Sequence, residues 1–436
     1  MSLENSISDF LQHLKSQNFD LYQFQSNKLG NKFDSKKDSV FYSGPYWDNR
    51  EIAAILESVL EGKWLSSGEK VNKFERQFSK VINADFSLMV NSGSSANLVM
   101  VATLKKYYGW NDGDEIIVSV VGFPTTASSI VQNGLVPVFV DITWDNLNWD
   151  LEQISSKITS KTKAIFSSPV LGNPYDMDFV LDLCDKSKIL LIADNCDSLG
   201  SKWRGKFLNE YAVAASCSFY PAHHITTMEG GMVSANSEEL IKMARSISWW
   251  GRACYCVGQQ NLLPNGVCKK RFDRWVDDCD YVLDHKYLFE NVGYNLKPLD
   301  LQGAVGIVQL TKLNEMEALR KRNKDFLDSA FRRISGTETL TEIEHAETSW
   351  FGKPIICESG ALKTSLVSYL ESNRVQTRNY FAGNLLIHPA YRKYGSWKDF
   401  PNANGVLEKV FFVGVSPTIN LGMLEYIDDL CKNFPQ

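Results

Sequence analysis

The chain of 436 residues is long enough for two domains, and its hydrophobic content of 44% and charged content of 22% are those of an ordinary globular protein. The net charge of −5, with no clustered stripe of lysine and arginine, argues against a surface that binds nucleic acid. Since no apolar run approaches the roughly 20 residues of a membrane span and residues 1–6 lack the basic and apolar regions of a signal peptide, we expect a cytoplasmic protein that binds neither nucleic acid nor membranes.

The chain begins with a polar extension, residues 1–45, which we expect to pack on the body or to fray, and whose sequence gives no indication of chemistry. Regular structure is predicted from Asp48, a plausible helix N-cap. Apolar residues follow at helical spacing over 52–60, and Gly62 stands where a helix-terminating glycine belongs. The pattern over 71–81 predicts a second amphipathic helix.

A strand end, a turn of small residues and a helix are predicted over residues 90–104. The turn contains Gly93, Ser94 and Ser95. Backbone N–H groups at a helix N-terminus, with hydroxyl groups beside them, favour anion binding. Turns of small residues before helices also occur where they only pack, so the turn by itself leaves both interpretations open.

Short apolar runs then alternate with helical patterns. Such alternation predicts an α/β domain with a mainly parallel sheet covered on both faces, and ligands of such sheets bind beyond the carboxyl ends of the strands. Asp194 directly follows a buried strand and therefore needs a partner. The candidate strands are 115–121, 136–141, 163–170, 188–194, 213–219 and 231–235.

The remaining chain is predicted to form a smaller C-terminal domain. We divide the chain into an extension (1–45), a large domain (46–314) and a small α+β domain (315–436). Arg378 lies in one of the most site-like stretches of the small domain. Its guanidinium suits either a diphosphate or an ordinary surface carboxylate.

Four of the nine cysteines are candidate ligands of a metal centre: Cys196, Cys254, Cys256 and Cys268. Four thiolates can hold a [2Fe–2S] cluster or a zinc ion, and buried thiols are the third interpretation. Cys196 lies two residues after Asp194, a distance of at most about 7 Å along the chain. A redox centre would have a reason to lie there, whereas a structural zinc ion would not.

Residues 216–231 read Ser-Cys-Ser-Phe-Tyr-Pro-Ala-His-His-Ile-Thr-Thr-Met-Glu-Gly-Gly. This stretch resembles the lysine segment of the DegT/DnrJ/EryC/StrS sugar aminotransferases, which use pyridoxal phosphate (PLP). The family pattern Ser-Phe-x-x-x-Lys places its lysine at His223. An imidazole cannot hold the cofactor covalently, so the resemblance implies noncovalent binding and a proton shuttle at His223. The alternative is two ordinary histidines in a turn.

The resemblance implies a PLP-dependent transferase of fold type I, like aspartate aminotransferase, that forms a homodimer. Phe123 would stack on the pyridine ring, and Asp194 would pair with the pyridine nitrogen. Asp197 stands where the family usually has Gln or His, which departs from a plain transaminase. Asn295 would reach the cofactor phosphate of the neighbouring subunit. The implied cofactor-binding residues are Gly93, Ser94, Ser95, Phe123, Asp194, Asp197, Ser218 and Asn295.

A closer resemblance depends on the cysteines and on the segment Asp284-His285-Lys286-Tyr287. These are similar to the iron–sulfur CDP-4-keto-6-deoxyglucose 3-dehydrase family over about residues 48–436. The loop 254–268 would hold cluster ligands, although the gap before Cys268 is longer than in that family, which puts this ligand in question.

This second resemblance implies pyridoxamine phosphate (PMP) and a [2Fe–2S] cluster as cofactors, with His223 and Asp194 catalytic. The substrate would be a nucleotide (CDP) 4-keto-6-deoxyhexose that loses its C3 hydroxyl and is then reduced, on the way to a 3,6-dideoxyhexose of lipopolysaccharide. A separate flavin or iron–sulfur NAD(P)H-dependent reductase is implied, because the chain has no Gly-x-Gly-x-x-Gly signature. The implied substrate residues are Tyr220, Phe351, Arg378 and Asn384.

Two other functions remain open. One is a cluster-free dehydratase of the GDP-sugar type, which also has histidine in place of lysine and regenerates its cofactor with glutamate; the four cysteines argue against it. The other is a non-catalytic regulator on the same fold. The presence of Phe123, Asp194 and Ser218 argues against loss of catalysis.

Overall fold

The computed structural model describes residues 3–17, 32–62, 64–254, 267–268, 270–273, 276 and 279–435. Its largest sheet has seven strands in the order β1-β9-β8-β5-β4-β2-β3. The pairs from β8 to β3 are parallel, whereas β9 is antiparallel to both β8 and β1. The strands are β1 (Phe86–Val90), β2 (Glu115–Ser119), β3 (Val136–Val140), β4 (Thr162–Ser167), β5 (Leu190–Asp194), β8 (Ala214–Ser218) and β9 (Gly231–Ala235).

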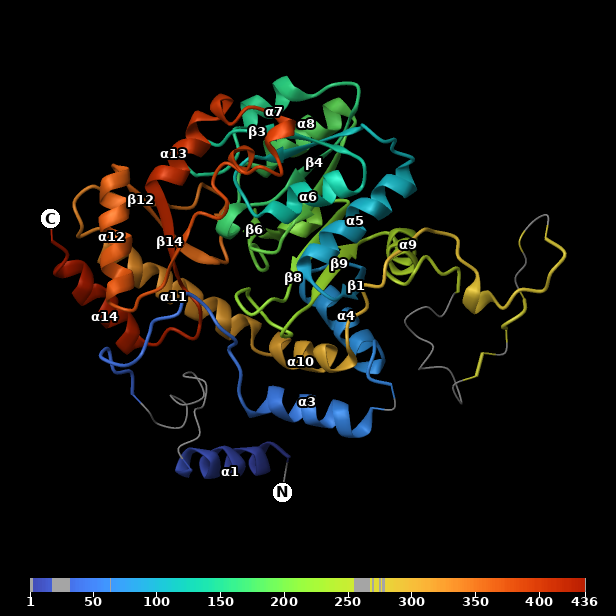
Figure 1. Cartoon of the computed structure of the whole chain (residues 1–436), viewed down its shortest axis with the longest axis horizontal. Coiled ribbons are helices and arrows are strands. Elements are labelled where there is room, and N and C mark those ends of the chain that lie inside the picture. Colours follow the sequence, from blue (N-terminus) through green and yellow to red (C-terminus); the bar gives the residue numbers. More distant parts are fainter. Residues whose placement is uncertain are drawn as a thin grey trace.

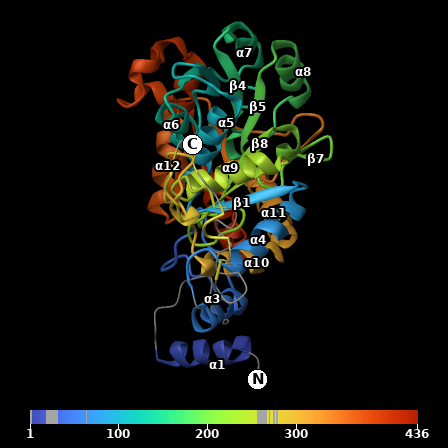
Figure 2. The same cartoon turned by 90° about the vertical axis from the view of Figure 1, so that its right-hand side faces the viewer.

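Helices cover both faces of this sheet (Figures 1 and 2). Neighbouring strand residues alternate between the faces: Ile116 packs in one buried cluster and Ile117 in another. One face carries α5 (Gly93–Tyr108), α6 (Pro124–Gln132) and α9 (Glu238–Ser248). The other carries α4 (Glu69–Val81), α7 (Leu151–Lys157) and α8 (Met177–Ser187). The predicted mainly parallel α/β sheet is thus confirmed, with the antiparallel β9 as an addition.

The helix predicted after Asp48 is α3 (Asn49–Glu61), and its N-terminus is doubly capped. The Asp48 carboxylate accepts a hydrogen bond from Arg50 N, and the Glu51 carboxylate accepts one from Asp48 N. Gly62 is the C-cap, as predicted. The first helix, α1 (Leu3–Ser16), packs on α3 through Ile7 and Leu11. On its other side α3 contacts α10 (Asp300–Leu310).

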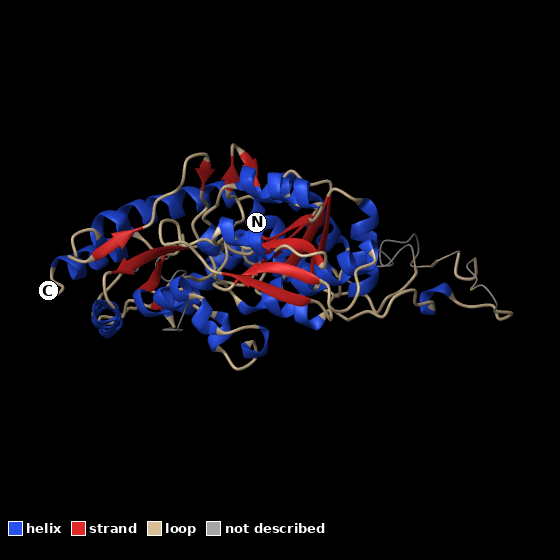
Figure 3. Ribbon diagram, turned by 90° about the horizontal axis from the view of Figure 1, so that it is seen from above, coloured by secondary structure: helices blue, strands red, loops and turns tan. Residues whose placement is uncertain are grey.

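A second, antiparallel sheet lies beside the first along the long axis of the molecule (Figures 1 and 3). Its order is β10-β12-β14-β13, and a third, small sheet has the order β11-β6-β7. The strands are β10 (Thr337–Thr339), β12 (Gly352–Cys357), β13 (Thr377–Asn379), β14 (Val410–Gly414), β6 (Lys202–Trp203), β7 (Lys206–Phe207) and β11 (Ala346–Glu347). The helices of this part are α11 (Leu313–Phe331), α12 (Gly360–Ser372), α13 (Pro401–Lys409) and α14 (Leu421–Lys432).

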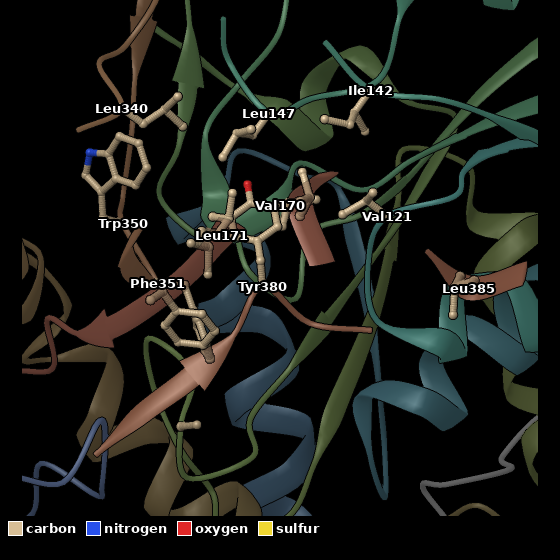
Figure 4. Close-up of a cluster of buried hydrophobic side chains, with 14 of the residues drawn as sticks. Val121, Ile142, Leu147, Val170, Leu171, Leu340, Trp350, Phe351, Tyr380 and Leu385 are labelled. Atoms are coloured by element: carbon tan, nitrogen blue, oxygen red, sulfur yellow. The ribbon is translucent and has the colours of Figure 1, made fainter. Parts of the chain in front are cut away.

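The two larger sheets share one hydrophobic core. Figure 4 shows Val121 and Leu171, which follow strands of the first sheet, in one cluster with Trp350 and Tyr380 of the C-terminal part. The division after residue 314 falls near the start of α11, and it stays a proposal because this core crosses it. In the part of the chain that the structure describes, no helix is long and apolar enough to cross a membrane.

Candidate active site

A cavity of about 750 Å³ opens at the carboxyl ends of the parallel strands, where ligands of such sheets bind. Its walls come from the segments that follow β2, β4, β5 and β8, from the start of α5, and from the second sheet. The predicted residues that line it are Gly93, Ser94, Phe123, Asp194, Cys196, Asp197, Ser218, Tyr220, His223, Phe351 and Arg378. The fold thus brings together eleven predicted residues from six separate stretches of sequence.

Three of the predicted cofactor- and substrate-binding residues do not line the cavity. Ser95 N donates to Ser92 Oγ at 3.1 Å, so Ser95 belongs to the helix cap, and it is Ser92 that faces the cavity. Asn295 accepts a hydrogen bond from Lys297, and its predicted reach to a neighbouring subunit stays a prediction.

Asn384 is fully buried, and the fold uses its amide. Its Nδ2 donates to Trp397 O at 3.0 Å and to Asn404 Oδ1 at 2.9 Å, and its Oδ1 accepts from Leu386 N at 3.0 Å. These bonds satisfy the donors and the acceptor of the amide. The structure therefore does not support Asn384 as a substrate ligand, and gives it the role of fixing the loop that follows β13.

Asp194 ends β5 and is 5% exposed. Its Oδ2 accepts hydrogen bonds from Asn97 Nδ2 and Thr126 Oγ1, both at 2.7 Å, and its Oδ1 accepts one from Cys196 N at 3.2 Å. These donors supply the partner that a buried carboxylate needs, and they fix its orientation. Asn97 on α5 and Thr126 on α6 were missed by the sequence reasoning; an isolated buried amide on an apolar helix was the available signal.

The start of α5 and the end of β8 approach closely enough to form an anion cradle. A Cβ atom on Gly93 would lie 2.4 Å from Ser218 Cβ, so a glycine is required at this contact. The hydroxyl groups of Ser92, Ser94 and Ser218 line the cavity beside the free N–H groups of the helix N-terminus. Backbone donors, hydroxyl groups and the helix dipole together favour a phosphate here.

His223 lies on the turn after β8, with its Nδ1 3.6 Å from Asp197 Oδ1. Burial lowers the pKa of His223 to about 3, and the nearby Arg320 charge adds to this effect. Burial and the neighbouring Asp194 carboxylate raise the pKa of Asp197 well above its usual range. Both shifts favour the uncharged forms, so the pair is a neutral imidazole beside a neutral carboxylic acid rather than an ion pair.

The two neighbouring histidines have different environments. His224 is 2% exposed, does not line the cavity, and its Nε2 contacts Ser349 O at 2.8 Å. His223 lines the cavity, and its ring lies 5.1 Å from the Phe351 ring. In both residues Nδ1 is buried without a hydrogen-bond partner among the described residues. Because only His223 of this pair lines the cavity, it is the histidine that can reach a ligand there.

Arg320 of α11 fixes the His223 turn from behind. Its guanidinium donates to His223 O at 2.9 Å and to Trp350 O and Phe351 O at 3.3 Å. The side chain is 2% exposed, and burial lowers its pKa to about 10. Arg320 stands in the basic run Arg320-Lys321-Arg322, and nothing in that run indicates a contact with residue 223, so this contact was not predicted.

The described candidate cluster ligands are not gathered around one point. Cys196 lines the cavity, Cys254 packs against Trp249, and Cys268 Sγ lies 3.7 Å from His285 Nε2. Cys256 lies outside the described residues. Among the residues that are described, no group of three or more His, Cys, Asp or Glu side chains is placed to hold a metal ion. These residues therefore do not fit a [2Fe–2S] cluster as they are arranged here.

The N-terminal extension contributes to the site, a role that its sequence left open. Tyr42 lines the cavity, and its ring stacks against the Arg378 guanidinium, whose Cζ lies 4.1 Å from the ring centroid. The polar composition of the extension does not indicate the contact between Tyr42 and Arg378, because the two residues are far apart in the sequence.

The arrangement of the sheets and of the cavity at the strand ends is that of the PLP-dependent aminotransferases, fold type I. The DegT/DnrJ/EryC1/StrS aminotransferase family matches residues 47–430, and the chain belongs to this family.

Several sugar dehydratases are among the chain's relatives. It is 36% identical over 401 residues to the dTDP-4-dehydro-2,6-dideoxy-D-glucose 3-dehydratase of Saccharopolyspora spinosa, covering 90% of this chain and 86% of that protein. It is also 36% identical over 402 residues to the lipopolysaccharide biosynthesis protein RfbH of Salmonella typhimurium, covering 90% and 91%.

Solved structures of related enzymes have the same fold as this chain. The Escherichia coli GDP-4-keto-6-deoxy-D-mannose 3-dehydratase with bound hydrated PLP is 32% identical, with a TM-score of 0.78 over 90% of this chain and 99% of that one. The Helicobacter pylori aminotransferase of pseudoaminic acid biosynthesis has a TM-score of 0.78 at 22% identity over 91% of this chain and 99% of that one, and it supports the fold alone. None of these four descriptions mentions CDP, an iron–sulfur cluster or a reductase.

Proposed function

We propose that this protein is a PLP- or PMP-dependent nucleotide-sugar 3-dehydratase that acts on a nucleotide 4-keto-6-deoxyhexose. The observation that carries the proposal is His223, which replaces the family lysine and lies in the cavity beside Asp197. The relatives named as sugar 3-dehydratases support the same reaction class.

The cavity residues fit the cofactor on three observations. The cradle of Gly93 and Ser218 offers hydroxyl and N–H donors for a phosphate. Asp194, held by Asn97 and Thr126, presents a fixed carboxylate for a protonated ring nitrogen. Phe123 is 53% exposed although it lines the cavity, so its ring face is open to a stacked heterocycle. When bound as the amine, the cofactor supplies a group that condenses with a ketone and a ring that accepts electrons.

His223 supplies the proton transfers. Its Nδ1 is buried beside Asp197, so we assign the transfers to the other ring nitrogen, Nε2, and the low pKa keeps the ring neutral near pH 7 so that this nitrogen can accept a proton. The imidazolium that results is a strong acid in its buried surroundings and returns the proton readily, here to the departing C3 hydroxyl. Arg320 holds the backbone of the turn so that the ring stays in place during both transfers.

Substrate contacts are proposed for three predicted residues that line the cavity. Tyr220 and Phe351 flank the His223 ring, at 6.5 Å and 5.1 Å between ring centroids, and would contact the sugar. Arg378 is exposed at the other side of the cavity and would bind the diphosphate. The expected homodimer would add residues such as Asn295 from a second copy.

The finer form of the proposal is the reductive one. It comprises a CDP-sugar substrate, a [2Fe–2S] cluster on Cys196, Cys254, Cys256 and Cys268, and a separate reductase. One observation favours it: Cys196 lines the cavity two residues from Asp194. The cluster-free dehydratase is the alternative, and the arrangement of the described cysteines is compatible with it.

Isotope exchange tests the central proposal. The full chain, loaded with PMP, is incubated with CDP-, GDP- and dTDP-4-keto-6-deoxyhexoses in ¹⁸O-labelled water, and label at C3 is measured by mass spectrometry. We expect exchange with at least one of them and a loss of about 10²–10⁴-fold in His223→Asn, because general acid–base catalysis contributes that much. The affinity for PMP should be kept, since His223 is not part of the phosphate cradle.

His345→Asn is the matched control, because His345 does not line the cavity. It should exchange at the wild-type rate. Exchange at an unchanged rate in His223→Asn would refute the assigned proton shuttle, and no exchange with any of the three sugars would refute the reaction class.

A further inference from the structure

The segment of residues 40–43 precedes the part of the chain that matches the family, residues 47–430, yet it is fixed against the second sheet. Val40 N donates to Arg374 O at 2.8 Å, and Gln376 N donates to Val40 O at 2.9 Å. Tyr42 N donates to Gln376 Oε1 at 3.3 Å. A Cβ atom on Gly414 would lie 1.8 Å from Tyr42 O, so a glycine is required for this contact.

The same segment also reaches the His223 turn. Ser43 Oγ donates to Ala222 O at 3.0 Å, and Ala222 both lines the cavity and precedes His223. The segment therefore joins the edge of the second sheet to the proton-transfer turn, and the Tyr42 side chain lies in the wall between them.

The Arg378 guanidinium lies over the Tyr42 ring. The Cζ atom lies 4.1 Å from the ring centroid, and the ring packs edge-on against Phe412, with centroids 6.3 Å apart. One N–H of the guanidinium donates to Thr377 O at 2.8 Å. Because a guanidinium carries five N–H donors, the bond to Thr377 O leaves others available for an anion.

The charged residues of the cavity indicate what Arg378 would bind. Among the described residues that line the cavity, Arg378 is the one permanently cationic side chain, whereas Asp194, Asp197 and Glu229 are acidic. Asp194 is buried and Arg378 is exposed, so the cation lies toward solvent. An anionic group of a substrate that enters beyond the phosphate cradle would meet this guanidinium.

We propose that Tyr42 is a positioning residue that holds Arg378 by stacking, so that the edge of the guanidinium binds the diphosphate of the nucleotide sugar. This inference rests on the proposed function, and it makes the N-terminal segment part of the substrate site. A stacked and hydrogen-bonded guanidinium loses less side-chain freedom when it binds phosphate, because it is already in the binding orientation.

The test measures the affinity of the full-length, PMP-loaded protein for CDP, GDP and dTDP by calorimetry, together with the kinetics of C3 exchange. Cation–π stacking is worth about 0.5–2 kcal/mol, so Tyr42→Leu and Tyr42→Met should each weaken nucleotide binding by about 2- to 30-fold. KM for the nucleotide sugar should rise by a similar factor while kcat stays unchanged, because Tyr42 does not contact the reacting atoms. Tyr42→Phe keeps the ring and should bind as the wild type does.

A double-mutant cycle separates positioning from general damage to the fold. Arg378→Gln should weaken nucleotide binding, and Tyr42→Leu should add nothing in that background, because the ring acts only through the guanidinium. PMP affinity should be unchanged in every variant, since neither residue belongs to the phosphate cradle.

The outcomes distinguish the inference from the proposed function. Unchanged nucleotide affinity in Tyr42→Leu and Tyr42→Met, or effects of Tyr42→Leu and Arg378→Gln that simply add, would overturn the inference and leave the dehydratase proposal intact. Nucleotide binding that depends on Tyr42 in a protein without C3 exchange would support the inference and refute the dehydratase. A wild-type protein that binds none of the three nucleotides would overturn both.

Discussion

His223 and Asp197 are the two residues whose charge states the fold changes most directly at the site. Their Nδ1 and Oδ1 atoms lie 3.6 Å apart, and burial opposes the charged form of each. In water at neutral pH, the same carboxylate would be ionised, and the same imidazole would be partly ionised. Their uncharged state in the cavity is therefore a consequence of the tertiary structure.

The lowered pKa of His223 predicts a specific acid sensitivity. In the unfolded chain the imidazole takes up a proton below about pH 6.5, whereas in the folded protein it stays neutral down to about pH 3. The unfolded state thus binds more protons between these values, so the stability present above pH 6.5 is lost as the pH falls toward 3.

His223→Asn should lower this dependence. The free energy of unfolding in urea, measured at several pH values between 6.5 and 3, should fall less steeply in the variant, by up to about 1.4 kcal/mol per pH unit. A residual slope is expected because the pKa of His224 is also lowered by burial. Parallel slopes for wild type and variant would contradict the buried, neutral His223.

The alignment of His223 with the family lysine has its own test. His223→Lys should hold PLP covalently, because a primary amine returns at the anchor position. After borohydride reduction, peptide mass spectrometry should find the cofactor on residue 223, whereas His224→Lys should not retain it, since His224 faces Ser349 in the core. Failure to link the cofactor at position 223 would refute the alignment.

At the scale of elements, the contact between α4 and α10 depends on small residues. A Cβ atom on Gly303 would lie 2.5 Å from Val71 N and 2.6 Å from Val71 Cα, so the two helix backbones touch here. These helices carry the chain from α3 to the large sheet and to α11, which holds Arg320 against the His223 turn.

Gly303→Ala should therefore destabilise the protein by about 1–3 kcal/mol, the usual cost of overpacking a well-packed contact. Gly422→Ala on α14 is the matched control, because its nearest neighbour would be Asn420 Oδ1 at 3.5 Å. Alanine favours helix over glycine, so this variant should be as stable as wild type or more stable. Equal urea midpoints for the two variants would show that α4 and α10 do not pack as closely as described.

At the scale of the whole molecule, the open point is whether distant cysteines meet around iron. Cys196 belongs to the cavity wall, while Cys254 follows α9 and Cys268 lies near His285. The reductive form of the proposal requires these segments to converge, and the cluster-free form does not.

The iron and sulfide content of anaerobically purified protein distinguishes the reductive form of the proposal from the cluster-free form. If the cluster is present, Cys254→Ser should lose iron and acid-labile sulfide, and net reduction to the 3-deoxy sugar should stop. C3 oxygen exchange should continue, because the cofactor cradle, Asp194 and His223 are untouched. Cys431 is a buried thiol on α14, and the Cys431→Ser protein should keep its iron. Wild-type protein without iron would support the cluster-free dehydratase instead.

From the sequence by itself came the strands of the large sheet and two residues of its cavity, Asp194 and His223. Strands buried on both faces are continuous apolar runs, so β2, β3, β4, β5, β8 and β9 were predicted within a few residues. Asp194 was found because an acid at the end of such a run needs a partner, and His223 because it breaks a local family pattern. Both signals are local in the chain.

Only the tertiary structure decided which partners meet. Asn97 and Thr126 reach Asp194 across 97 and 68 positions, and Tyr42 is fixed to Gln376 across 334. Neither composition nor periodicity carries information about such contacts, because they arise when helices and strands pack, and many side chains of the same type would look alike in the sequence. For the same reason Asn384 was assigned to the substrate from its local motif, whereas packing uses its amide within the loop.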